Sequence, residues 1–224
     1  MDIGRSLKFM FEDESWITRI LIGGILGFIP IVNFVVYGYQ LEVIKNVSQD
    51  QDLPLPEWDD FGGKFIKGLM VMIAGFIYSL PLVLVGIVYF VVMMIVGGGA
   101  ASTGSEDLTG AAGGLFAVCT IAFYCVAFLY GIIVYGFVLI PGVMRYAEEE
   151  EFGAFFKFGE NLRVATSNLG SYIVMLLVIM LVGIVAELVG LIACGIGLLF
   201  TIFWALLVSG HLFGQYWKEN KATI

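Results

Sequence analysis

Long stretches without a single charged residue constrain the fold of this 224-residue chain more than any other feature of its sequence. About 20 apolar residues are enough for a helix to cross the hydrocarbon core of a bilayer. Lipid offers the backbone no hydrogen-bonding partner, and the alternating pattern of barrel strands is absent, so each stretch is expected to be helical. The uncharged runs, of 22, 38, 37, 23 and 30 residues, are 20–41, 68–105, 108–144, 164–186 and 188–217.

The sequence therefore predicts an all-α, polytopic helical membrane protein whose residues 1–224 form a single membrane domain. Pro81 is expected to kink the first span, because proline removes a helical hydrogen bond and clashes with the preceding turn. Residues 97–110 are expected to form a Gly/Ser-rich loop, and 190–197, with three glycines, a tight turn. The four predicted full spans are 68–96, 111–142, 170–190 and 196–216.

The composition agrees with this class and excludes others. Hydrophobic residues make up 60% of the chain and charged residues only 13%, about half the share found in soluble domains. So much apolar side chain is incompatible with disorder. The net charge of −8 leaves no basic face that could neutralise phosphates, so no nucleic-acid partner is expected. The expected environment of the apolar surface is the lipid bilayer.

The N-terminal hydrophobic segment, 16–40, is the ambiguous one because small and polar residues interrupt its middle. It forms either one kinked span or two half-helices that enter the membrane and return. A signal peptide is not expected, because acidic residues precede the segment and no small-x-small cleavage site follows it. The interrupting residues are Gly23, Gly24, Gly27, Pro30 and Asn33.

Basic residues indicate which side of the membrane each connection occupies, because cytoplasmic segments carry the excess of Lys and Arg. The segments 43–67 and 143–169 and the C-terminal tail 217–224 hold basic residues, whereas 97–110 and 190–197 hold none. This pattern orders the four spans consistently. Re-entry of the N-terminal segment would leave all 11 basic residues on one side. We therefore favour re-entry and expect the N- and C-termini to be cytoplasmic.

Two of the predicted cytoplasmic segments resemble each other. Residues 59–68 and 150–159 share an acidic pair, Phe, Gly, Phe and Gly at matching offsets, and each lies between two apolar runs. This predicts a tandem repeat in which 16–96 corresponds to 111–190, with chance similarity in a Phe- and Gly-rich chain as the alternative. Parallel repeats place corresponding segments on the same membrane face, in agreement with the charge pattern.

Aromatic residues gather in and beside both segments, next to charged ones. An apolar stripe beside charged groups predicts short amphipathic helices that lie in the headgroup layer. Such helices either anchor the protein at the interface and fix helix tilt, or offer a docking surface to a soluble partner. The interfacial or docking candidates are Trp58, Phe61, Phe65, Phe152 and Phe156.

The sequence shows no catalytic, cofactor-binding or metal-binding pattern. The only histidine, His211, follows Ser209 by two residues on one helix, so the two side chains point to different sides and the hydroxyl lacks a base. Cys119, Cys125 and Cys194 form neither a disulfide framework nor a zinc pattern and are interpreted as small packing residues. We expect no enzymatic activity, no metal and no cofactor.

Three polar residues of the apolar stretches are low-ranking functional candidates. Glu187 is the one acidic residue there, and intramembrane carboxylates are often functional, although its position near a predicted outer turn also suits an interfacial or helix-packing role. His211, about one turn from the predicted cytoplasmic end, suits polar packing or an interfacial role. Asn33, with Pro30, lies where a broken helix could expose polar groups to a solute.

Small residues four positions apart permit close contact between membrane helices. Such contacts either lie inside the protein or form a face for another membrane protein or a second copy. The pairs are Gly23/Gly27, Ala186/Gly190 and Gly210/Gly214.

A specific motif precedes the first span: Leu55-Pro56-Glu57-Trp58-Asp59-Asp60-Phe61, with Gly38-Tyr39 before it and Lys67-Gly68-Leu69 after it. It resembles a family of prokaryotic membrane proteins, domain of unknown function 4013 (DUF4013). The ending Gly210–Tyr216 also looks like that family's C-terminal helix, so the resemblance covers about 16–217. It implies a polytopic helical fold in a prokaryotic cytoplasmic (inner) membrane, and it implies no established activity or catalytic residue.

Taken together, these features favour a non-catalytic scaffold or accessory subunit of a membrane complex, because the helices hold few polar groups. The alternative is a small transporter or channel, whose polar path would pass Asn33 and Pro30, or Glu187.

Overall fold

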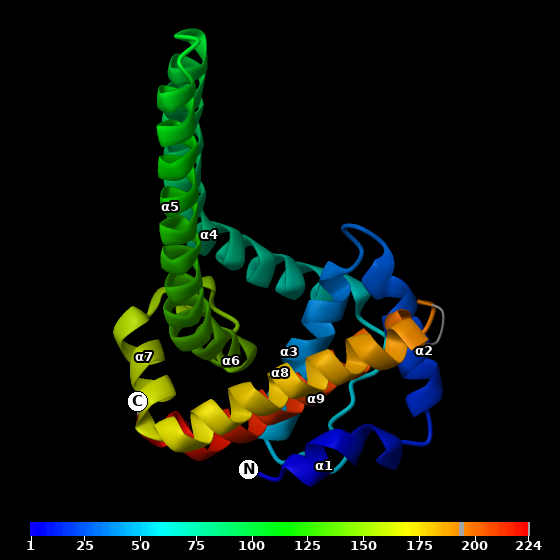
Figure 1. The fold of residues 1–224 in the computed structure, drawn as a ribbon. Helices are drawn as coiled ribbons and strands as arrows, with labels where there is room; N and C mark the ends of the chain where they lie inside the picture. The colour runs from blue at the N-terminus through cyan, green and yellow to red at the C-terminus, as the bar shows by residue number, and fades with distance from the viewer. Residues whose placement is uncertain (193–194, 224) are drawn as a thin grey trace. The chain divides into compact units, whose positions relative to one another are not determined.

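The computed structural model describes residues 1–192 and 195–223, and every regular element in this part of the chain is a helix (Figure 1). The chain divides into two compact units. The first unit comprises Met1–Ala74 with Phe137–Ile224, and the second comprises Gly75–Gly136. The predicted all-α class is confirmed.

Four helices are long and apolar enough to cross a membrane, as the sequence predicted. The second of them begins as α5 (Glu106–Tyr130), continues through the π-helical turns of η2 (Gly131–Leu139) and ends as α6 (Ile140–Glu149). All four extend beyond at least one predicted end, because the flanking residues continue the helical hydrogen bonding. They are α4 (Phe61–Ser102), the α5–η2–α6 helix, α8 (Leu169–Ile192) and α9 (Leu198–Asn220).

The prediction of a loop over 97–110 was wrong. α4 continues to Ser102 and α5 begins at Glu106, so the Gly- and Ala-rich flanks are helical. Gly104 adopts a φ of +67°, a left-handed conformation that glycine tolerates and that terminates helices. The Ser105 side chain then accepts a hydrogen bond from the Leu108 N–H at 3.4 Å and caps α5. Local capping therefore shortens the connection to a few residues.

The connection between α8 and α9 is also shorter than the predicted 190–197, since α8 reaches Ile192 and α9 begins at Leu198. Cys194, interpreted as a packing residue, lies outside the described residues. Cys119 is half-buried and Cys125 is exposed. Pro81 lies inside α4, and the helix continues through it.

The N-terminal hydrophobic segment is broken into two helices at its Gly-, Pro- and Asn-containing middle, whereas its re-entry into the membrane stays a prediction. α2 (Trp16–Phe28) and α3 (Phe34–Ser48) are joined by residues 29–33 and contact each other. At 1.5 Å per residue α2 is about 20 Å long, too short to cross a hydrocarbon core of about 30 Å. α2 by itself is therefore too short to be a full span.

The segment 54–58 contacts both the start of α2 and the end of α3. The Arg19 guanidinium, near the start of α2, donates to the Leu55 carbonyl at 2.5 Å. The Asn46 amide, near the end of α3, donates to the Pro54 carbonyl at 3.1 Å. The chain thus enters and leaves this helical pair near one place, a geometry that favours re-entry.

α3 is largely buried in the first unit and packs against α2, α6 and α9. Its backbone also touches the start of α4. A Cβ atom added at Gly38 would overlap the Lys64 carbonyl oxygen, and one added at Gly68 would overlap the Phe34 carbonyl oxygen. Two glycines therefore permit a backbone-to-backbone contact that a larger residue at either position would prevent.

The small-residue pairs are used mostly inside the first unit. A Cβ atom added at Gly23 would meet the Phe203 ring, and one added at Gly190 would meet residues of α9. A Cβ atom added at Gly210 or Gly214 would meet residues of α3, whereas Gly27 faces open space. Ala186 is buried as well. Of the two interpretations of these pairs, the structure favours internal packing over a free face for a partner.

The predicted short interfacial helix near Trp58 is not a separate element. Phe61 and Phe65 belong to the first turns of α4, which Asp60 caps by accepting a hydrogen bond from the Gly63 N–H at 2.9 Å. The separate-helix prediction was wrong because no turn interrupts the chain between this stripe and the apolar run. In the second segment, Phe152 and Phe156 lie in a short 3₁₀ turn, η3 (Phe152–Phe156).

The remaining elements are short and belong to the first unit. α1 and η1 precede α2, α7 connects η3 to α8, and η4 ends the described chain. They are α1 (Ile3–Lys8), η1 (Phe9–Glu12), α7 (Phe158–Ser167) and η4 (Lys221–Thr223).

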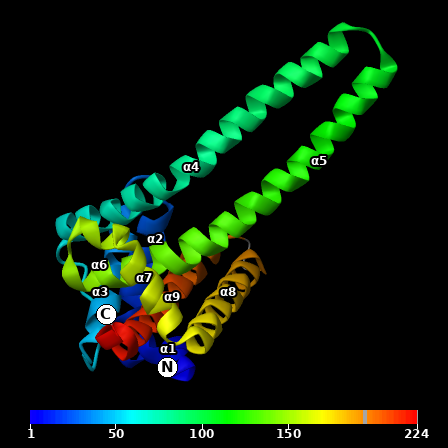
Figure 2. The ribbon, with the colours of Figure 1, turned by 90° about the vertical axis from the view of Figure 1, so that its left-hand side faces the viewer.

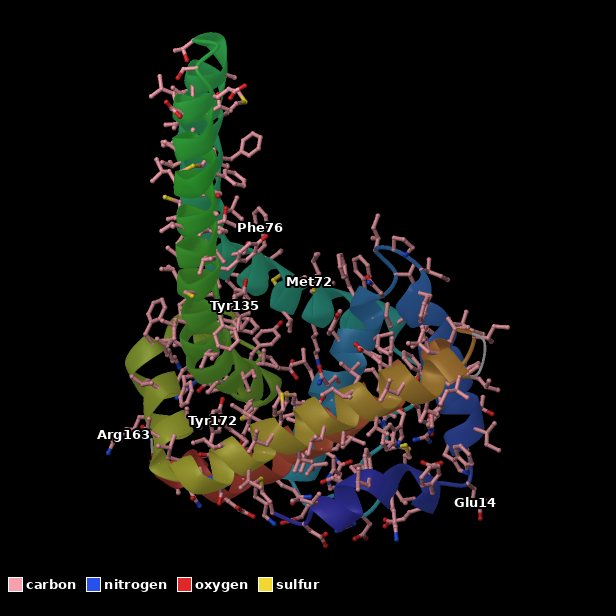
Figure 3. All side chains as sticks on the ribbon, viewed as in Figure 1. Glu14, Met72, Phe76, Tyr135, Arg163 and Tyr172 are labelled. Carbon is pink, nitrogen blue, oxygen red and sulfur yellow. The ribbon has the colours of Figure 1, made fainter. Side chains whose placement is uncertain are left out.

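The second unit is a hairpin formed by the distal part of α4 and by α5, whose legs run antiparallel (Figure 2). Few side chains join the legs: the Tyr89 ring stacks on Phe123 with centroids 5.1 Å apart, and the Tyr130 hydroxyl donates to the Tyr78 carbonyl at 2.6 Å. Side chains project outward along both legs (Figure 3), and α5 contains no buried residue.

The α3–α4 backbone contact predicts a large penalty for one methyl group. Gly68→Ala is expected to lower the unfolding free energy by about 1–3 kcal/mol or more, because the helices must separate. The matched change Gly183→Ala, at a glycine with nothing within 4 Å, should be neutral or stabilising by up to about 1 kcal/mol. Thermal unfolding in detergent measures both, and equal midpoints would contradict the contact.

Candidate functional site

A small pocket lies where the break between α2 and α3 meets the first half of α9. Its volume is about 90 Å³, and its lining side chains are mostly apolar, apart from one amide and the Tyr37 hydroxyl. It therefore offers room for a few small atoms and very limited hydrogen bonding. The lining residues are Gly23, Gly24, Gly27, Phe28, Asn33, Val36, Tyr37, Leu199, Ile202, Phe203 and Leu206.

Asn33 supplies that amide, and the nearby backbone offers its side-chain oxygen no hydrogen-bond donor. An Asn at the start of a helix usually accepts a hydrogen bond from the backbone two or three residues later. At α3 those donors are already used, since the Val35 N–H binds the Val32 carbonyl and the Val36 N–H binds the Asn33 carbonyl. The Oδ1 atom of Asn33 is buried, and no donor among the described residues reaches it.

The connection that carries Asn33 is strained. Ile31 has a φ of +74°, in the left-handed region that β-branched residues rarely adopt. Such a conformation costs about 1–3 kcal/mol and occurs most often at binding sites and switch segments. The break thus combines backbone strain with an unpartnered acceptor, which makes it the leading candidate site.

His211 lies in a separate polar cluster of the first unit. It is buried, its ring packs on Phe9 with centroids 4.3 Å apart, and its Nδ1 lies 2.9 Å from both Ser6 Oγ and Gln215 Nε2. The Gln215 amide can only donate through this nitrogen, so Nδ1 accepts and the ring is neutral with its proton on Nε2. The polar packing role expected for His211 agrees with this geometry.

The pairing of His211 with Ser6 was not visible in the sequence, because the two residues are 205 positions apart. A hydroxyl 2.9 Å from an imidazole is the geometry of a nucleophile and its base. Here, however, Ser6 is fully buried, and the Asp2 carbonyl at 3.0 Å competes with His211 for its single hydroxyl proton. A substrate would have no access to this hydroxyl, so the pair fits a structural role.

Glu187 is not brought together with the other two candidates. It lies on the exposed surface of α8, between the exposed Ile184 and Leu188, and the structure shows no ion pair to it among the described residues. Its position five residues before the end of α8 suits contact with headgroups or water. Nothing in this arrangement forms an enclosed ion site at Glu187.

The motif around Trp58 holds α2 and α3 together. The Trp58 ring stacks on Tyr39 with centroids 4.2 Å apart, and its Nε1–H donates to the Arg19 carbonyl at 3.1 Å. The Tyr39 hydroxyl in turn donates to the Pro56 carbonyl at 2.7 Å. Trp58 is half-buried in these contacts, so it takes part in internal packing, and its docking role stays a prediction.

Lys64 is a buried charge that sequence reasoning missed. Its side chain is only 2% exposed and its ammonium lies 2.9 Å from Glu42 and 3.2 Å from Asp59. A buried ammonium needs such partners, because removing an ion from water costs several kcal/mol. One of the two acidic partners, Asp59, belongs to the acidic pair before α4, and the other, Glu42, lies in α3.

A second set of ion pairs joins α3, α4 and α6. Glu150, which follows α6, lies 2.7 Å from Lys45 and 3.0 Å from Lys67. Hydrogen bonds from these two ammonium groups hold the pKa of the Glu150 carboxyl below its usual range. Nearby, the buried Arg145 pairs with Glu149 at 3.1 Å and Glu160 at 2.7 Å. The acidic run after α6 thus neutralises buried and half-buried cations.

The remaining candidates from the sequence are the four phenylalanines, which are exposed or half-buried. Phe61 is exposed, whereas Phe65, Phe152 and Phe156 are half-buried, and Phe152 and Phe156 pack edge to face on each other. In the part of the chain that the structure describes, no three His, Cys, Asp or Glu side chains are grouped as a metal site would require.

Comparisons with known proteins add a family but no function. The model of a family described as "Protein of unknown function (DUF4013)" matches residues 22–195, most of the chain. No curated protein and no solved structure matches.

The Lys64 site predicts an ordered pair of mutational effects. Glu42→Gln is expected to destabilise the protein by about 3 kcal/mol, because its loss leaves a buried ammonium without its better shielded partner. Asp59→Asn should cost less than about 1 kcal/mol, because the Asp59 side chain is 72% exposed whereas that of Glu42 is 22% exposed. Chemical or thermal unfolding of the two variants compares them; a larger loss for Asp59→Asn would refute the assignment.

Glu150 predicts a pH dependence of stability. Its folded-state pKa is depressed below 4.5, so its contribution is present above about pH 4.5 and is lost as the pH falls through the folded-state value. Glu150→Gln should lower the midpoint of unfolding near pH 7 and flatten its acid slope. Glu151→Gln, at an exposed neighbour that takes part in no ion pair shown by the described residues, is the control. Identical acid slopes for wild type and Glu150→Gln would exclude this role.

Proposed function

We propose, from the premise that this chain belongs to the DUF4013 family of proteins of unknown function, that it is a scaffold or accessory subunit of a membrane complex and has no catalytic activity. Its four apolar helices make it a multi-pass membrane protein. We further propose the prokaryotic inner membrane and cytoplasmic N- and C-termini, which the distribution of basic residues supports.

The hairpin of the second unit is the observation that carries this proposal. Near its tip the legs leave two grooves, of about 440 and 240 Å³, that are lined by glycine and alanine together with larger, mostly apolar side chains. Gly99 lies in the first groove and Gly113 in the second, and an added Cβ at either would meet nothing within 4 Å. Small residues that permit close approach, without a helix packed on them, are suited to a helix of another membrane protein.

Among the described residues, the side chains that could pair a nucleophile with a base are buried, which supports a non-catalytic role. In the described residues, the one close Ser–His pair is the buried Ser6 and His211. Gln40 and Ser209 likewise bind each other at 2.8 Å inside the first unit. Such internally paired groups stabilise a fold but offer nothing to a substrate.

A small transporter or channel is the second candidate, and the Asn33 pocket is the observation that favours it. An unpartnered oxygen at a helix break is one way in which transporters bind solutes. A polar path would have to continue from this pocket, and its other lining side chains are apolar apart from the Tyr37 hydroxyl. We therefore rank transport below the scaffold role.

The scaffold proposal predicts a stoichiometric partner that depends on the hairpin groove. The protein purified from its native membrane in mild detergent should carry that partner, Gly99→Leu should lose it, and Gly98→Leu should retain it. Gly98 is the matched control, because it is equally exposed but is not among the residues lining either groove. Leucine at 99 fills the groove that the partner helix would occupy.

Two results would overturn this proposal. If the Gly99→Leu and Gly98→Leu variants retain equal amounts of the partner, the groove is not the site where the partner binds. Solute flux in proteoliposomes that vanishes in Glu187→Gln would assign a transport function instead.

A further inference from the structure

The pocket at the α2–α3 break has the chemistry of a site for one hydrogen-bond donor. A buried acceptor without a partner costs about 1–3 kcal/mol, so natural proteins seldom keep one. The Asn33 Oδ1 atom is such an acceptor, and it lies in a residue that lines the pocket. If the Asn33 side chain turns this oxygen toward the pocket, a donor bound there removes the cost.

The donor is expected to be neutral. No carboxylate lines the pocket, so a bound cation would have no counter-ion, and an unpaired charge in apolar surroundings costs far more than one hydrogen bond returns. A hydroxyl group satisfies the acceptor without this penalty.

The pocket opens onto a surface suited to lipid. Phe28 and Ile202 line it and are themselves exposed. Phe28 continues an exposed apolar row on α2 that includes Ile17, Leu21 and Ile25, three residues at a spacing of four. A ligand that approaches across this row comes from the bilayer, where the rest of an apolar molecule can stay.

Size limits what can enter. About 90 Å³ accommodates a hydroxyl group and a few carbon atoms, because one water occupies about 30 Å³ in the liquid. Gly27 keeps this space open, since an added Cβ there would meet nothing within 4 Å. The rest of a longer molecule would lie outside the pocket.

From these observations we propose that the pocket binds the hydroxyl end of a neutral lipid alcohol, with the hydroxyl donating to Asn33 Oδ1 and the chain lying along α2. Phe28 and Phe203 contact the first carbon atoms. The site is independent of the scaffold role proposed above, because it lies in the first unit and uses none of the hairpin residues.

The test uses the full chain in nanodiscs and two photoactivatable probes. One is a twelve-carbon primary alcohol with a diazirine near the hydroxyl, and the other is its methyl ether, which cannot donate. The alcohol is expected to label peptides from 27–37 and 199–206 about fivefold more than the ether, the ratio for one hydrogen bond of about 1 kcal/mol. Equal labelling by both probes, or labelling of neither peptide, would overturn the proposal.

Variants locate the site. Asn33→Leu removes the acceptor at similar size and should abolish the preference for the alcohol. Gly27→Leu fills the pocket and should abolish labelling by both probes there. Gly183→Leu, at a half-exposed glycine of α8 that is also free of contacts within 4 Å, should leave labelling unchanged. Retained alcohol preference in Asn33→Leu would contradict the assignment, and the wild-type comparison of probes decides the question if a variant does not fold.

Discussion

The backbone contact between α3 and the start of α4 is the constraint on which the first unit depends. It exists because Gly38 and Gly68 have no side chain to hold the helices apart. The contact brings Lys64 against Glu42, so that the buried ammonium has a partner. It also holds the residues before α4 against α3, where the Trp58 ring stacks on Tyr39. One steric condition thus determines an ion pair and an aromatic stacking contact.

The first unit satisfies nearly all of its buried polar side chains internally. Among the described residues only two buried side-chain atoms lack a partner, Asn33 Oδ1 and Arg145 Nη2. The Arg145 charge is nevertheless neutralised by Glu149 and Glu160, so its unpaired nitrogen belongs to a group that is otherwise bound. Asn33 has no such compensation. A single acceptor therefore stands out chemically, in a connection that Ile31 also holds under strain.

The two units solve the burial of apolar residues in different ways. In the first, α3 and α9 bury side chains against each other and against α2 and α6. In the second, α5 contains no buried residue, and a few aromatic contacts such as Tyr89 on Phe123 join the legs. Apolar side chains that are not buried by protein require lipid or another helix, which is the physical basis of the scaffold proposal.

The sequence by itself determined the four membrane-crossing helices, the break in 16–40 and the family, because hydrophobic length, Gly/Pro interruption and the Trp58 motif are local signals. It named Asn33 and His211, but it did not show that the Asn33 oxygen is unpartnered or which residues bind His211. Only the tertiary structure decided that Ser6 binds His211, that Lys64 is buried, and that the small-residue pairs pack mostly inward. These facts arise from residues far apart in the chain, and side-chain burial depends on how helices cross, which no local pattern records.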